Sequence, residues 1–226
     1  MSHLQALGDS ITCGEGVGVR VELRDTWTAR LAEALGLGHT SLASPGRRVR
    51  DVLADQLPLA CPAPVSTLLV GLNDVARPGY DVERITDGLD RLVRRLTALS
   101  PTLVLGRLHD PSRVMRMPLP LAVLARRRVG AINAVIDRLA SYDGVVLLDL
   151  EQVPELRRRD GWAVDRVHPS VTGQAGLARA AAAALGVELP VVPATRAPGT
   201  VARGVWCARH GAPYLAGQLI AGLATR

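Results

Sequence analysis

The sequence predicts an α/β protein, a three-layer α/β/α sandwich around a parallel sheet of about five strands, with a helical extension at the C-terminus. Three observations support this fold class. Short apolar runs alternate along the chain with longer stretches of helical periodicity, as in successive β-α-β units. The runs STLLVGL, TLVLGRL and GVVLLDL are almost wholly apolar, which is typical of central parallel strands buried on both faces. The length of 226 residues suits one domain with an appendage.

The expected strands and helices alternate from the N-terminus to residue 185. Strands are expected at residues 4–7, 39–43, 67–72, 102–108 and 145–150. Helices are expected between and after them, at residues 26–35, 49–59, 82–99, 121–140 and 171–185. The second strand, HTSLA, mixes polar and apolar residues, so it is predicted to lie near an edge of the sheet.

The chain divides into three predicted segments: a domain over 1–186, a proline-rich linker over 187–200 and a helical extension over 201–226. In the extension, apolar residues recur on one helical stripe, which consists of Val201, Val205, Ala208, Ala212, Leu215, Leu219 and Leu223. Pro213 is expected to kink or restart that helix. Packing of the stripe on its own domain is favoured over a homodimer contact or a lid.

Composition excludes several classes of function. The net charge of +6 comes with 27 basic residues, all arginine, that are scattered along the chain, and aromatic residues are few, so nucleic acid is not an expected partner. No apolar run approaches the ~18 residues that a membrane span needs, and no leader precedes the first strand, which predicts a cytoplasmic protein. Three widely spaced cysteines indicate reduced thiols rather than disulfides or a metal site.

Polar residues follow the apolar runs, where an open parallel sheet binds its ligands. Gly-Asp-Ser ends the first run, and Ser10 is a candidate nucleophile if a base can take its proton. His168, before the last predicted helix, is the candidate base. Asp165, three residues earlier, can hold one tautomer of its imidazole and stabilise the imidazolium. Together they predict a Ser, Asp, His set in that chain order.

Acyl transfer also needs hydrogen-bond donors for the developing oxyanion. Three are proposed: the backbone amide of Ser10, the backbone amide of Gly46 and the side-chain amide of Asn73. Loss of one such donor typically costs roughly 3 kcal/mol of transition-state stabilisation, so Asn73 is expected to matter more for rate than for folding. Each motif alone also has an ordinary structural interpretation as a turn, a loop glycine or a helix cap.

Taken together, GDSIT, the loop glycine in SPGRRVRDV, GLND and DRVH resemble the four signature blocks of the SGNH hydrolases, also called the GDSL family of esterases and lipases. The resemblance covers about residues 3–186 and implies a flavodoxin-like sandwich and a serine-ester mechanism without metal or other cofactor. It assigns Ser10, Gly46, Asn73 and His168 to the four residues of the family name, and Asp165 to the aspartate. The sequence departs from the pattern in having Arg47 and Arg48 beside the glycine.

Other residues near the expected crevice have weaker assignments. His109 follows the fourth strand, and a role in substrate recognition or in fixing the loop is favoured over a second acid-base pair with Asp110. Arg107 and Arg113 are expected to hold an anionic group, because arginine favours carboxylate and phosphate. The glycines of GEGVG (14, 16 and 18) are interpreted as a flexible active-site loop rather than as a dinucleotide fingerprint, since GDSIT occupies the strand-to-helix turn.

The resulting functional hypothesis is a serine hydrolase that cleaves carboxylic esters of small molecules through an acyl-enzyme on Ser10. An acyltransferase shares the first half of that chemistry and differs in excluding water and binding an alcohol or amine acceptor. A binding protein of the same fold without turnover is the third hypothesis. It is disfavoured because such a protein has no need of nucleophile, base, orienting carboxylate and oxyanion donors together.

Overall fold

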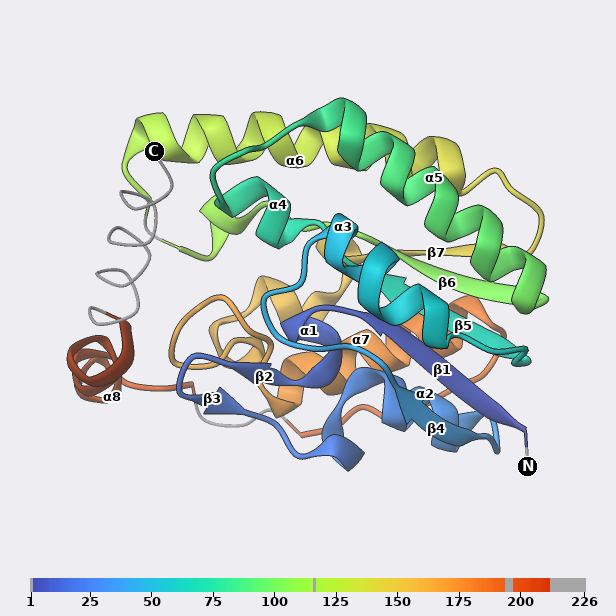
Figure 1. The fold of residues 1–226 in the computed structure, drawn as a ribbon. Coiled ribbons are helices and arrows are strands. Elements are labelled where there is room, and N and C mark those ends of the chain that lie inside the picture. Colours follow the sequence, from blue (N-terminus) through green and yellow to red (C-terminus); the bar gives the residue numbers. More distant parts are fainter. Residues whose placement is uncertain (1, 116, 194–196, 212–226) are drawn as a thin grey trace.

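A parallel five-stranded sheet forms the centre of the fold (Figure 1). The structure is a computed structural model and describes residues 2–115, 117–193 and 197–211. The strands are β1 (His3–Gly8), β4 (Gly38–Ser41), β5 (Val65–Leu69), β6 (Thr102–Arg107) and β7 (Val145–Asp149). Their order in the sheet is β4-β1-β5-β6-β7, all neighbours being parallel. This is the flavodoxin-like order, and the predicted fold class is confirmed.

The strand positions follow from side-chain polarity. β5 is buried at every residue, as its apolar run predicts for a central strand. β4 pairs only with β1 and lies at the edge, where its histidine, threonine and serine are partly exposed. The order reverses between β4 and β5, which lie on either side of β1. The carboxyl end of β1 is therefore the switch point of the sheet, where ligands bind in this class of fold.

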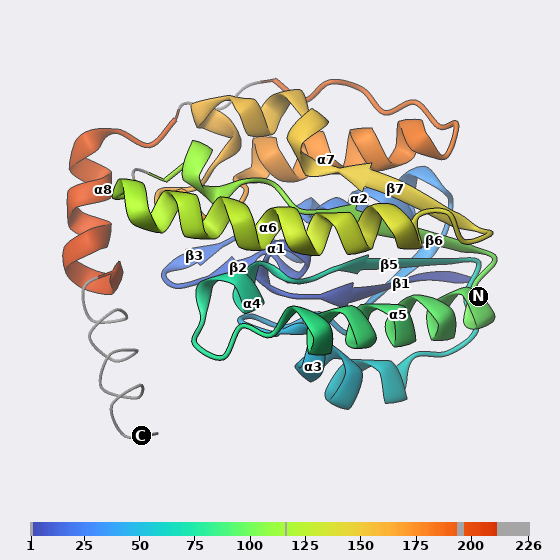
Figure 2. The ribbon, with the colours of Figure 1, turned by 90° about the horizontal axis from the view of Figure 1, so that it is seen from above.

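Helices cover both faces of the sheet (Figure 2). The elements α2 (Trp27–Ala34) and α7 (Val171–Ala184) pack together on one face. On the other face lie α3 (Val49–Asp51), α5 (Val82–Leu99) and α6 (Leu119–Leu139). The bounds of α5 match the prediction. The side chain of Asp81 caps the N-terminus of α5. The buried residues of this helix recur at helical spacing; they are Ile85, Gly88, Leu89, Leu92, Val93 and Leu96.

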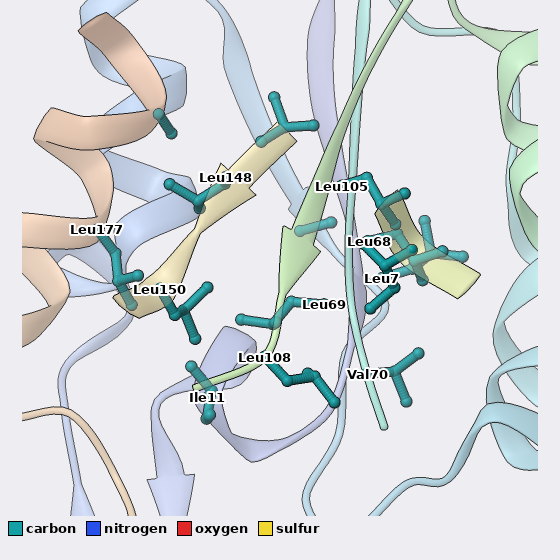
Figure 3. Packing of buried hydrophobic residues seen from close by; sticks show 14 of the residues in the cluster. Leu7, Ile11, Leu68, Leu69, Val70, Leu105, Leu108, Leu148, Leu150 and Leu177 are labelled. Carbon is teal, nitrogen blue, oxygen red and sulfur yellow. The ribbon is translucent and has the colours of Figure 1, made fainter. Parts of the chain in front are cut away.

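The hydrophobic core lies between these layers. Figure 3 shows Leu177 of α7 beside Leu148 and Leu150 at the end of β7. Leu177 is fully buried, and burial of a leucine side chain contributes about 2 kcal/mol to the stability of the folded state. Ile11, from the turn after β1, joins the same cluster and so anchors the segment that carries Ser10.

The segment expected as a helix over 49–59 is irregular. It consists of α3, a π-helical turn over Val52–Gln56 and a 3-10 turn over Leu57–Leu59 that contains Pro58. The side chain of Gln56 is buried in the π-helical turn and makes two hydrogen bonds of 2.9 Å with the backbone N–H and carbonyl of Gly8. These bonds satisfy the last backbone groups of β1. A regular helical periodicity could not reveal such a long-range contact.

Two further elements follow the core strands in space. A short antiparallel hairpin, β2 (Glu15–Gly16) and β3 (Val19–Arg20), lies after Ser10, where a flexible loop was expected. The helix α8 (Thr200–Trp206) lies beside the turn of this hairpin in both ribbon views (Figures 1 and 2). The indole Nε1 of Trp206 donates to the carbonyl of Val17 at 2.8 Å. The extension thus contacts the domain through the hairpin.

The predicted apolar stripe falls only partly within the described residues. Val201 is 82% exposed and Val205 is 49% exposed, so neither makes the expected packing contact within the described part of the chain. Ala212, Pro213, Leu215, Leu219 and Leu223 lie outside the described residues. The contacts of α8 and the turn that follows it come instead from Trp206 and from His210, whose ring packs against Gly18.

The described residues bear on the expectations about membrane spans, metal sites and cysteines. No helix among them is both long and apolar enough to pass through a bilayer. Within the same residues, no group of three or more histidine, cysteine, aspartate or glutamate side chains is arranged to hold a metal ion. Cys13, Cys61 and Cys207 are free thiols.

Candidate active site

Ser10 is the first residue of α1 (Ser10–Cys13), a short helix that begins directly after β1. The strand ends at Gly8, where φ is +146° and any Cβ would collide with the carbonyl oxygen of Leu69, so only glycine fits. Asp9 caps the helix, because its Oδ1 accepts the N–H of Ile11 at 3.0 Å. The turn that places Ser10 at the carboxyl end of β1 is therefore specified by Gly8 and Asp9.

Asp165 orients His168 through three contacts. Its Oδ2 binds the imidazole Nδ1 at 2.5 Å, while its Oδ1 accepts the backbone N–H of His168 at 3.1 Å and that of Val167 at 3.0 Å. Because Nδ1 faces the carboxylate, Nε2 is the ring nitrogen left to exchange a proton with a substrate or nucleophile. The side chain of His168 is 13% exposed and that of Asp165 is 2% exposed, so water competes little for the hydrogen bond between them.

The charge state of Asp165 suits an orienting role. Burial by itself raises the pKa of this carboxyl, but the hydrogen bond and charge of His168 and the two backbone N–H donors together hold the pKa below its usual value. The carboxylate is therefore ionised at neutral pH. An ionised partner at Nδ1 stabilises the imidazolium that forms when His168 takes a proton.

The segments that carry the predicted nucleophile and base, α1 and the residues before α7, lie close together. The side chain of Gln174, in the first turns of α7, donates to the carbonyl of Ile11 at 2.9 Å. Helix α1 and the start of α7 are thus joined directly.

The hairpin β2-β3 packs on the imidazole of His168. A Cβ at Gly16 would overlap Cε1 and Nδ1 of that ring, so the backbone of β2 lies in direct contact with the histidine. The interpretation of these glycines as a flexible loop is wrong for Gly16, which lies in a strand and whose lack of a side chain makes room for the imidazole ring. Two-residue strands are too short to give an alternating pattern in a sequence, which is why they were not predicted.

Asn73 links the loops that carry the other predicted oxyanion donors. It lies in the first turn of α4 (Leu72–Ala76), and its Nδ2 donates to Asp9 Oδ2 at 3.2 Å and to the carbonyl of Arg47 at 3.1 Å. Gly46, next to Arg47, has a φ of +74°, which favours glycine. Both N–H groups of the Asn73 amide therefore have protein acceptors, and donation to a substrate oxygen requires that one of these bonds be shared or replaced.

Two buried carboxylates beside the motif residues were missed in the sequence. Asp9 precedes Ser10, and Asp74 follows Asn73 and accepts the backbone N–H of Val49 at 3.1 Å. Burial raises the pKa of each to about 6, partly offset by these N–H donors. Their adjacency to predicted site residues was the available signal, but burial cannot be read from adjacency alone.

The predicted substrate-binding arginines have protein partners. Arg107 contacts Asp137 at 2.9 Å and Asp149 at 3.4 Å through its guanidinium. Arg113 is 72% exposed and lies 3.9 Å from Glu151. Both arginines thus lie beside carboxylates of the protein, and their role in binding an anion stays a prediction.

His109 is buried against Trp162, with ring centroids 4.7 Å apart. Burial lowers its pKa to about 4, so the ring is neutral at physiological pH. Its Nδ1 has no hydrogen-bond partner in the described part of the chain. Asp110, the next residue, pairs with Arg126 at 3.3 Å. A substrate-binding role for His109 stays a prediction, and its packing on Trp162 accounts for its position.

The sequence of the chain matches one known protein family. The sequence profile of the GDSL-like lipase/acylhydrolase family matches residues 6–175, which span Ser10, Gly46, Asn73, Asp165 and His168. The chain belongs to this family. It is accordingly an enzyme of the esterase and hydrolase class, and the resemblance stated from the four sequence blocks is confirmed. No curated protein matches the chain in sequence.

Solved structures with the same fold include several hydrolases. LAE5, an alpha/beta hydrolase enzyme from the metagenome of Lake Arreo, Spain, is 24% identical with a TM-score of 0.62, over 82% of this chain and 95% of that one. Axe2, an acetylxylan esterase from Geobacillus stearothermophilus, is 23% identical with a TM-score of 0.61, over 86% and 97%. TesA is 19% identical with a TM-score of 0.63, over 81% and 98%. At these identities the likeness concerns the fold.

Proposed function

We propose that the protein hydrolyses carboxylic esters of small molecules through an acyl-enzyme on Ser10. The observation that carries the proposal is the buried Asp165–His168 pair, with 2.5 Å between Oδ2 and Nδ1, at the edge of the sheet where α1 begins. A histidine fixed in one tautomer next to a strand-end serine is the arrangement that nucleophilic acyl chemistry requires.

In the first half-reaction, Ser10 Oγ attacks the ester carbonyl carbon while His168 Nε2 takes the hydroxyl proton. The C–O bond of the ester breaks when the tetrahedral intermediate collapses, and the imidazolium returns the proton to the departing alkoxide. Charge on the intermediate's oxygen is stabilised by the N–H groups of Ser10 and Gly46 and by the amide of Asn73. The products at this stage are the free alcohol and the acylated Ser10.

In the second half-reaction, His168 takes a proton from a water molecule that attacks the acyl carbon. Collapse of the new intermediate returns the proton to Ser10 and releases the carboxylic acid. An alcohol in place of water would give a new ester by the same steps, which is the acyltransferase alternative. Because Axe2 is an acetylxylan esterase, acetyl esters are the first substrates to test here.

The decisive experiment is labelling with a fluorophosphonate probe, which phosphonylates an activated serine. The wild type is expected to be labelled and to release 4-nitrophenol from 4-nitrophenyl acetate. Ser10→Ala is expected to lose both signals, and His168→Ala is expected to lose them to a large degree while circular dichroism shows a folded protein. Equal labelling of wild type and Ser10→Ala, or none in a folded wild type, would leave a binding protein as the better account.

Hydrolysis and transfer are separated by the products formed in the presence of an alcohol. With increasing methanol or glycerol, an esterase still gives mainly free acid, in proportion to water. Predominant formation of the new ester at low alcohol concentration would instead show a built acceptor site and contradict hydrolysis as the main reaction.

A further inference from the structure

Arg77 lies beside the predicted oxyanion loop, although no motif includes it. It directly follows the last residue of α4 and is four positions after Asn73. A Cβ at Gly46 would lie 2.8 Å from Arg77 Nη2, which places the guanidinium against the glycine of that loop. A cation thus lies next to Gly46, one of the candidate donors, and Asn73 donates to the neighbouring residue of the same loop, Arg47.

The charge of Arg77 has no counter-charge in the described part of the chain. Its neighbours in the second sequence block are all committed to other groups. Arg47 binds Asp55 at 2.7 Å and Ser44 at 2.9 Å. Arg50 pairs with Asp51 at 3.3 Å.

Arg48 and Asp74 also lie close to this cation; each has a hydrogen-bond partner, although the buried Nε of Arg48 has none among the described residues. Arg48 donates to the carbonyl of Pro78 at 3.2 Å. Burial, followed by the like charges of Arg50 and Arg77, lowers the pKa of Arg48. Asp74 is turned inward, where its Oδ2 accepts the N–H of Val49. Arg77 is therefore half-buried, unpaired among these residues and repelled by its neighbours.

An unpaired, half-buried cation costs free energy of folding unless a ligand binds to it. A planar guanidinium is well suited to binding a carboxylate or another anionic oxygen group in a two-pronged arrangement. By contrast, Arg107 already faces two carboxylates, Asp137 and Asp149. Among the arginines near the site, Arg77 is thus better placed than Arg107 to bind an anion.

We propose that Arg77 binds an anionic oxygen group of the substrate, so that the enzyme favours esters that carry a carboxylate over neutral esters of the same shape. This inference rests on the proposed esterase function and adds the substrate class to it. The anion would lie next to Gly46, at the side of the pocket where the carbonyl oxygen of the ester is held. Arg77 would then determine specificity, and Ser10, His168 and Asp165 would carry out the chemistry.

The test compares charged and neutral substrates in matched pairs. One pair places the charge in the acyl part: the 4-nitrophenyl ester of succinate and that of 4-methylpentanoate, its neutral isostere. The second pair places it in the alcohol: 4-acetoxybenzoate and its methyl ester. The measured quantity is the ratio of kcat/KM for the charged over the neutral member, after subtraction of the spontaneous rate.

For at least one pair, the wild-type ratio is expected to exceed one and to fall with added salt, because salt screens the attraction. Arg77→Gln should lower that ratio roughly tenfold to a hundredfold, mainly through KM, and Arg77→Glu should lower it further. Arg50→Gln is the matched control, since it removes a nearby positive charge that is paired with Asp51, and its ratio should stay that of the wild type.

Two results would overturn the inference while leaving the esterase function intact. The first is a kcat/KM ratio that is unchanged in Arg77→Gln. The second is an equal loss of kcat/KM for both members of each pair, which would make Arg77 a general stabiliser of the oxyanion. In either case fluorophosphonate labelling of Ser10 persists and shows that the variant is folded. Absence of both turnover and labelling in the wild type would instead contradict the proposed function, and this inference with it.

Discussion

At the scale of single residues, the site depends on a few side chains whose neighbours leave them one arrangement. Asp165 is the clearest case, because two backbone N–H groups and Nδ1 of His168 all point at its two oxygens. Asn73 is shared in the same way between Asp9 and the carbonyl of Arg47. These hydrogen bonds hold the side chains in one orientation, but they also occupy the N–H donors of Asn73. A substrate oxygen must therefore compete with the acceptors that these donors already have in the resting enzyme.

Asp165→Asn tests the orienting role at this scale. The amide keeps the shape but loses the charge, and its NH₂ group facing His168 favours the wrong tautomer. We expect kcat for 4-nitrophenyl acetate to fall by roughly three to four orders of magnitude with little change in the folded structure. Asp90→Asn is the control, because Asp90 forms an exposed ion pair with Arg94 on α5, and its kcat should equal that of the wild type. A loss below tenfold in Asp165→Asn would contradict the assignment.

At the scale of elements, the hairpin β2-β3 connects the extension to the catalytic base. One side of it packs on the ring of His168 at Gly16, and its turn receives the indole of Trp206 at Val17 and the ring of His210 at Gly18. The hairpin therefore lies between α8 and the active site. The glycines are needed here for close approach of backbone to aromatic rings, a use different from loop flexibility.

Gly16→Ala tests whether this contact positions the histidine. The added methyl group overlaps the imidazole, so the ring must move from its place against Asp165. We expect kcat to fall about tenfold to a hundredfold, because a shift of about 1 Å in a catalytic group has effects of that size, while KM changes little. The rate of fluorophosphonate labelling should fall in proportion.

Gly130→Ala is the matched control for this change. Gly130 lies within α6, and a Cβ there meets nothing within 4 Å. The substitution should leave kcat unchanged and stabilise the helix by about 0.5–1 kcal/mol. Equal kcat values for the two variants would refute a positioning role for the hairpin.

At the scale of the whole molecule, folding buries carboxylates that the site holds in place. Asp9 and Asp74 are 2% and 8% exposed, and each has a pKa of about 6 against an ordinary value of 3.8. A carboxyl whose pKa is higher in the folded than in the unfolded state binds its proton more tightly when folded. These two carboxyls therefore lower the stability of the protein as the pH rises from about 4 to about 6, and their contribution is constant above that range.

Asp74→Asn is expected to remove this dependence at one of the two positions. The asparagine Oδ1 can still accept the N–H of Val49, but no charge is buried at neutral pH. From pH 4 to pH 7 the free energy of unfolding of the variant should rise relative to the wild type by about 2–3 kcal/mol, from two pKa units at about 1.4 kcal/mol each. Urea unfolding at several pH values measures the difference.

Asp90→Asn provides a control of opposite sign. Hydrogen bonds from Arg94 and Tyr142 hold the pKa of Asp90 below its usual value, so this variant should lose stability relative to the wild type as the pH rises through 4. If the free energies of unfolding of Asp74→Asn and of the wild type change in parallel between pH 4 and 7, the pKa of Asp74 is not raised by burial in the folded protein.

The sequence by itself determined the sheet, its edge strand and the residues of the four blocks. These features depend on local patterns: apolar runs mark buried strands, the polar HTSLA run marks an edge, and Ser10, Asn73 and His168 lie at strand or helix ends that periodicity reveals. Burial and adjacency of chemical groups are different, because they arise from residues distant along the chain.

Only the tertiary structure decided that Gly16 makes room for the ring of His168, that Arg107 faces Asp137 and Asp149, and that the unpaired cation beside Gly46 is Arg77. The same holds for Gln56, which lies in a π-helical turn instead of a regular helix and binds the backbone of Gly8. In each case the free energy depends on whether a charge or backbone group finds a partner across the fold. That pairing is set by how the layers pack, which no local pattern in the sequence encodes.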